Sequence, residues 1–113
     1  MTNRIRNEIS HTIGDHEYLF RVSFQAILDI EDLYDGLSIH TILADIIADG
    51  ITVNHLLGIL KSGIAAAAQP YDEKQLINDI ELEGMNNSAN IAVEILTVGL
   101  NGGKQFEEEA KKK

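Results

Sequence analysis

Residues 7–22 read NEISHTIGDHEYLFRV, and their apolar side chains recur at every second position. This period of two is typical of a half-buried β-strand. The pattern is interrupted once, at Gly14-Asp15. Because Gly at the first central position suits a type II′ turn, the stretch predicts a hairpin. One face of that hairpin would carry Ile9, His11, Ile13, Tyr18, Phe20 and Val22.

A two-residue turn also fixes the pairing of the two strands. It places Ile13 opposite His16, Ile9 opposite Phe20, and Glu8 opposite Arg21 as a cross-strand ion pair. A lone hairpin is only marginally stable in water, so this one is expected to pack on the rest of the chain.

After Val22 the apolar period changes to that of helices, and most of the predicted helices have recognisable start and stop signals. The expected N-caps are Ser23, Ser38, Thr52, Asp72 and either Asn87 or Ser88, and the corresponding ends are Gly36, Gly50, Pro70, Gly84 and Gly102-Gly103. Asp72 and Gln75 resemble a capping box. In the first helix the apolar arc holds Phe24, Ala26, Ile27, Leu28, Ile30, Leu33 and Tyr34.

These elements predict an α+β fold, with an N-terminal β-hairpin packed on a bundle of about five short helices. We expect one domain over residues 1–103, with the hairpin at 4–22 and the helical part at 23–103. Residues 104–113 read as a charged, disordered tail.

The composition of the chain excludes several classes of function. The 113 residues include no Cys, which excludes disulfides and thiolate chemistry, and the net charge is −9. Such an acidic chain repels phosphate backbones, so nucleic acid is not an expected partner. With neither a signal-peptide pattern nor an apolar run of about 20 residues, no membrane association is expected, and the protein reads as cytoplasmic.

Four carboxylates crowd the stretch SFQAILDIEDLYDG at residues 23–36, but helix geometry disperses them. Only Glu31 falls within the apolar arc. It reads either as a general acid or base with a raised pKa, or as half of a structural buried ion pair with Arg21 or Lys61. No second catalytic group accompanies it, which favours the structural interpretation, and we predict the buried ion pair Glu31–Arg21.

No other pattern indicates catalysis, so we expect no catalytic residues, no metal and no cofactor. The four histidines lack the i, i+4 spacing of a helical zinc site, and no phosphate-binding glycine motif or nucleophile motif occurs. Gly58 and Gly63 lie inside the third helix and indicate either close helix contact or local flexibility.

The third helix is apolar over most of its circumference, LLGILKSGIAAAA at residues 56–68. It is therefore either the central helix of the core or a partly exposed binding surface. Taken as a surface, it predicts partner binding through Leu56, Leu57, Leu60 and Ile64, together with Phe106 of the tail.

The order of motifs resembles the small tail-assembly chaperones of gene transfer agents and related long-tailed phages. The resemblance covers residues 4–103. It is carried by YLFRV at 18–22 running into residues 23–36, DGITVNHLLGIL at 49–60, and AVEILTVGLNGG at 92–103. This chain departs from the family at the hairpin turn, which reads Gly-Asp in place of Asp-Gly.

The resemblance implies a non-enzymatic protein of the bacterial host cytoplasm. Such a protein would cover the tape-measure protein of a phage tail and help recruit tail-tube subunits. It could also self-associate. The alternative is a structural virion protein such as a head–tail connector subunit. A third alternative is a small acidic decoy that occupies a nucleic-acid-binding enzyme. An enzyme is the last alternative.

Overall fold

The computed structural model describes residues 7–101, and it has the predicted α+β fold. The predicted tail at 104–113, the glycines expected to end the last helix and Phe106 lie outside the described residues. The elements are β1 (Glu8–Ile13), β2 (His16–Arg21), α1 (Phe24–Leu33), α2 (Ile39–Asp49), α3 (Val53–Ala67), α4 (Glu73–Glu83) and α5 (Met85–Asn101). No helix within residues 7–101 has the length and apolarity required to cross a membrane.

The hairpin has the predicted register. Ile13 pairs with His16, Ile9 with Phe20 and Glu8 with Arg21. Gly14 has a φ of 60°, whereas Asp15 is not among the residues with positive φ, as a type II′ turn requires. The apolar face is buried, with Ile13 and Phe20 at 0% exposure.

Four of the five predicted N-caps are confirmed. The side chains of Ser23, Ser38, Thr52 and Asp72 each accept a backbone N–H of the helix that follows. The capping box is not completed, because the Gln75 amide donates to the Tyr18 hydroxyl instead. The predicted start of the last helix is wrong: α5 begins at Met85, directly after Gly84.

Helix α3 is the centre of the molecule, and both of its glycines mark close contacts. A Cβ at Gly63 would lie 3.1 Å from Cδ1 of Phe20, and one at Gly58 would lie 2.5 Å from Cδ1 of Leu33. The hairpin and α1 thus approach α3 where it has no side chain. This confirms the close-contact interpretation of both glycines.

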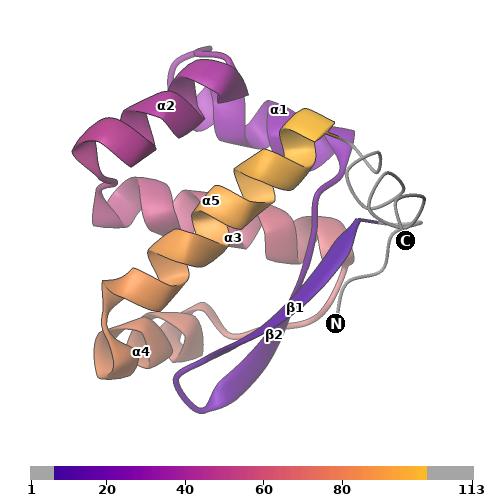
Figure 1. The fold of residues 1–113 in the computed structure, drawn as a ribbon. Coiled ribbons are helices and arrows are strands. Elements are labelled where there is room, and N and C mark those ends of the chain that lie inside the picture. The colour runs from indigo at the N-terminus through magenta and orange to yellow at the C-terminus, as the bar shows by residue number, and fades with distance from the viewer. Residues whose placement is uncertain (1–6, 102–113) are drawn as a thin grey trace, which may run out of the picture.

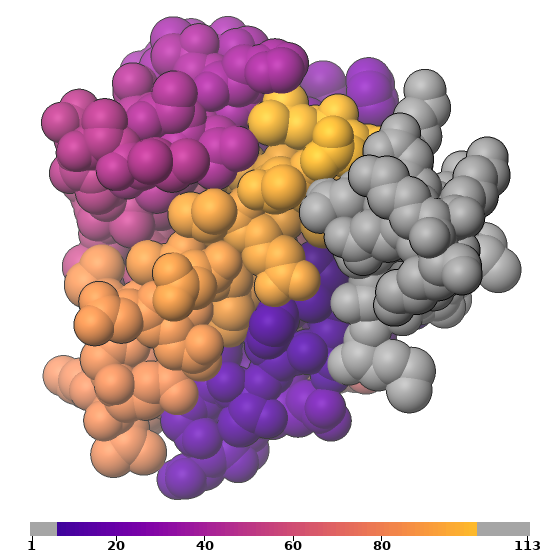
Figure 2. All heavy atoms as spheres, viewed as in Figure 1, coloured from indigo at the N-terminus to yellow at the C-terminus, as the bar shows by residue number. Residues whose placement is uncertain are grey.

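The remaining helices close around this centre. Helix α5 crosses in front of α3, with α1 and α2 at one end of the molecule and α4 at the other (Figure 1). In the space-filling view α5 lies between α2 and the hairpin and touches both (Figure 2). The core therefore draws on all seven elements.

The apolar arc predicted for α1 is too wide. Ala26 and Ile30 are buried, but Phe24 is 78% exposed and Leu28 45% exposed. Because this ten-residue helix packs mainly on α3, it buries only a narrow stripe of its surface, and the remaining apolar side chains stay exposed.

The prediction of a buried ion pair between Glu31 and Arg21 is also wrong. Both residues are only half-buried. Arg21 alternates with Phe20 along β2 and so lies on the strand face that points away from the core. The Glu31 carboxylate accepts a hydrogen bond from the Ile39 N–H at 3.1 Å, at the start of α2. Glu31 therefore supports a helix N-terminus, whose free donors and dipole favour an acidic side chain.

We expect Glu31→Ala to lower the free energy of unfolding by about 1 kcal/mol, the typical cost of losing a helix cap. Urea denaturation measures this loss. Asp32→Ala, at the exposed neighbouring position, serves as the control and should change stability by less than about 0.5 kcal/mol. Equal losses in the two variants would show that the bond to Ile39 contributes nothing.

Candidate functional site

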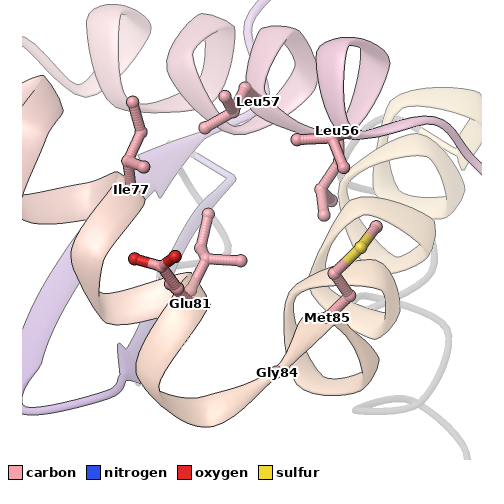
Figure 3. A pocket seen from close by; sticks show the side chains of 8 residues that line it. Leu56, Leu57, Ile77, Glu81, Gly84 and Met85 are labelled. Atoms are coloured by element: carbon pink, nitrogen blue, oxygen red, sulfur yellow. The ribbon is translucent and has the colours of Figure 1, made fainter.

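An open pocket of about 350 Å³ lies between the first half of α3, the outer side of α4 and the first residue of α5. Its lining is apolar except for one carboxylate, and consists of Val53, Leu56, Leu57, Ile77, Ile80, Glu81, Gly84 and Met85. In the close-up, Leu56 and Leu57 point from α3 toward α4, and Met85 lies across the pocket from Ile77 (Figure 3).

The sequence builds this pocket from three short segments. Val53 and Leu57 are one turn apart on α3, and Ile77 and Glu81 are one turn apart on α4. Gly84 then ends α4 with a φ of 94°, a conformation that favours glycine, and α5 starts at once. The sharp connection brings Met85 beside the α4 residues.

The pocket lining includes apolar side chains that remain in water. Val53 is 54% exposed, Ile77 40% and Met85 37%. Covering apolar surface of this kind with a partner is favourable, because each Å² removed from water lowers the free energy by about 25 cal/mol. The pocket is thus suited to holding apolar side chains of another molecule.

The structure places some of the predicted binding residues in the core and others in the pocket lining. Leu60 and Ile64 belong to the sealed core, at 0% and 1% exposure, so their prediction as partner-binding residues is corrected. Leu56 is equally covered, at 0%, but forms part of the pocket wall, and half-buried Leu57 lines the pocket beside it. The hairpin, α1 and α5 pack against α3, whereas the first turns of α3 line the pocket.

Sequence reasoning missed Ile77 as a binding residue and did not consider Met85. The helical period places Ile77 beside Leu76 and Ile80 on the apolar side of α4, and these two neighbours are 0% and 7% exposed, whereas Ile77 is 40% exposed. The signal for Met85 is its place immediately after Gly84, where a helix without a capping side chain begins.

Two carboxylates of α4 differ in their surroundings. Glu73 forms an ion pair with Lys61 of α3 at 3.0 Å, one turn beyond the pocket on both helices. The Lys61 ammonium has a raised pKa because it hydrogen-bonds to Glu73. Glu81, in contrast, is exposed on the pocket rim and has no hydrogen-bond or ion-pair partner among residues 7–101.

A separate polar cluster joins the hairpin to α4. Its centre is Asp79, which is 4% exposed. The Asp79 carboxylate accepts from the Tyr18 hydroxyl at 2.6 Å and contacts Nδ1 of His16 at 2.9 Å. Gly14 sits tightly against it, since a Cβ there would lie 2.9 Å from the Asp79 Cα. Sequence reasoning did not single out Asp79, which looks like any polar residue of an amphipathic helix.

This cluster shifts two pKa values. Burial tends to raise the pKa of Asp79, but hydrogen bonds from Tyr18, His16 and the Asp15 backbone outweigh it and hold the pKa below 3.8. Burial, together with the hydrogen bond to Asp79, raises the pKa of Tyr18 from 10.0 to about 12.

Further polar contacts attach the other strand and the turn. His11 Nε2 lies 2.7 Å from the Glu94 carboxylate, the Gly14 N–H donates to Glu83, and the Asn87 amide donates to the Thr12 carbonyl. The two hairpin histidines therefore contact separate carboxylates. No group of three or more metal-ligating side chains occurs within residues 7–101. The arrangement serves to hold the hairpin in place.

Comparison with known proteins yields no match to a family model, a curated protein or a solved structure. The pocket and its surroundings therefore carry the functional argument.

The Asp79 cluster predicts how stability depends on pH. The Tyr18 pKa is higher in the folded state than in the unfolded chain, so this contribution is complete below pH 10 and is lost as the pH rises toward 12. The Asp79 pKa is lowered by folding, so its contribution is complete above the usual carboxyl pKa and is lost as the pH falls through the lowered value.

We expect Tyr18→Phe to lower the free energy of unfolding at pH 7 by about 1.5–3 kcal/mol, because a buried carboxylate loses a donor. The fall in stability between pH 10 and 12 should also become shallower. Urea titrations across this pH range measure both effects, with Tyr71→Phe as the control outside the cluster. An unchanged alkaline profile in Tyr18→Phe would contradict the assignment.

Proposed function

We propose that this chain is a non-enzymatic tail-assembly chaperone of the bacterial cytoplasm. In this role it covers apolar helical stretches of a phage tape-measure protein before the tail is built, and it helps to recruit tail-tube subunits. The observation that carries the proposal is the open apolar pocket between α3, α4 and the start of α5.

The chemistry of the pocket suits a helical partner. A helix offers apolar side chains at positions i, i+3, i+4 and i+7, and such side chains fill apolar grooves between helices of a recognition protein. The pocket has apolar walls on α3 and α4, with exposed Val53 and Ile77 at its opening. Long apolar helices are the part of a tape-measure protein that would aggregate when uncovered.

The charge of the domain supports the same role. The 113 residues contain 18 Asp and Glu against 9 Lys and Arg, hence a formal net charge of −9 with neutral histidines. Net charge far from zero keeps a protein and its complexes soluble through repulsion. An acidic coat on an apolar partner would therefore delay its aggregation.

The test is co-expression with the tape-measure protein. The unaltered chain should keep the tape-measure protein in the soluble fraction and co-purify with it. Ile77→Glu, which places a carboxylate in the pocket, should weaken the complex at least ~10-fold, as expected when a charge is buried without a partner. Leu82→Glu is the matched control, since Leu82 is 67% exposed on the same helix and outside the pocket.

Failure of the unaltered chain to solubilise or bind the tape-measure protein would reject the proposed function. Equal losses in Ile77→Glu and Leu82→Glu would place binding elsewhere on the molecule. Presence of the chain in finished tails would instead favour a structural virion protein.

A further inference from the structure

We propose that the occupant of the pocket is a basic amphipathic helix, whose apolar side chains fill the pocket while a neighbouring Lys or Arg pairs with Glu81. This inference rests on the proposed function and specifies the chemistry of the segment that the chain recognises.

The composition of the pocket indicates a protein segment. Small-molecule sites combine apolar walls with several converging polar groups that fix the orientation of the ligand. Here Glu81 supplies the one charged side chain of the lining, and the pocket opens broadly to the surface. Apolar walls with a charge at the rim match the way an amphipathic helix docks in a groove.

Glu81 determines the sign of the charge that the partner segment is expected to carry. Its carboxylate lies on the same wall as Ile77, facing the pocket (Figure 3). A helix seated against Ile77 and Met85 would reduce the access of water to this carboxylate. Burial of an unpaired charge is costly, so the occupant is expected to bring a cation to it.

No Lys or Arg within residues 7–101 is seen to pair with the Glu81 carboxylate. Lys61 is already paired with Glu73. Lys74 is seven residues before Glu81 on α4, about 10 Å along the helix axis. Arg21, the remaining cationic side chain of this part of the chain, lies on the hairpin. Within residues 7–101 the Glu81 carboxylate is thus available to pair with a cation of the partner.

The charge of the whole domain favours the same occupant. With a net charge of −9, the chain attracts a basic segment and accelerates its association. The same charge repels a second copy of the domain, nucleic acid and anionic membranes.

The experiment is a charge swap with two designed 18-residue peptides. Both place Leu at i, i+3, i+4 and i+7 of a helix, and one carries Lys and the other Glu one turn from the Leu stripe. Fluorescence anisotropy at low salt measures their affinity for the full chain. We expect the Lys peptide to bind at least ~10-fold more tightly than the Glu peptide, the scale of a close ion pair of 1.4 kcal/mol.

Glu81→Lys should reverse this preference, so that the Glu peptide becomes the tighter ligand. Asp32→Lys is the matched control, because it changes the net charge equally from the exposed side of α1. Thermal denaturation verifies that both variants are folded. The control should keep the preference for the Lys peptide.

Three outcomes would overturn the inference: no binding of either peptide, equal binding of both, or the same change in Glu81→Lys and Asp32→Lys. Co-purification of the same variants with the tape-measure protein separates the two proposals. If the unaltered chain retains the tape-measure protein and Glu81→Lys does so equally well, the inference fails and the proposed function stands. If the peptides show the swap but the tape-measure protein does not co-purify, the proposed function fails.

Discussion

The packing of the hairpin on α3 is the constraint from which the rest of the arrangement follows. A two-stranded hairpin cannot bury its own apolar face, so Ile9, Phe20 and their neighbours need a helix to cover them. Phe20 meets α3 at Gly63, and Leu33 of α1 meets it at Gly58. The first turns of α3 form one wall of the open pocket beside α4.

Charge has two separate roles in this small acidic protein. Asp79, Glu83 and Glu94 hold the hairpin to α4 and α5 through side-chain and backbone donors. Many of the other carboxylates lie on solvated helix faces, where they contribute to solubility. Glu81 belongs to neither group, because it lies exposed at the rim of an apolar pocket and has no hydrogen-bond or ion-pair partner among residues 7–101.

Local patterns predicted much of the fold. The Gly14-Asp15 turn fixed the strand register, and Ser23, Ser38, Thr52 and Asp72 marked helix starts correctly, because turns and caps depend on neighbouring residues. The predictions that failed were ones that needed tertiary information. Phe24 and Leu28 were assigned to the buried arc of α1, and Leu60 and Ile64 to a binding surface, because periodicity identifies an apolar face without showing what covers it. Asp79 was missed for the same reason.

The central claim is that the pocket between α3 and α4 is the surface this protein presents to a partner. Methyl-detected NMR during titration with the tape-measure protein tests it most directly, because Leu57, Ile77 and Met85 each carry a methyl probe. The account predicts that these signals shift first, while those of core residues such as Ile13 and Ile95 follow only weakly. Shifts centred on exposed Leu28 of α1, with the pocket signals unchanged, would contradict it.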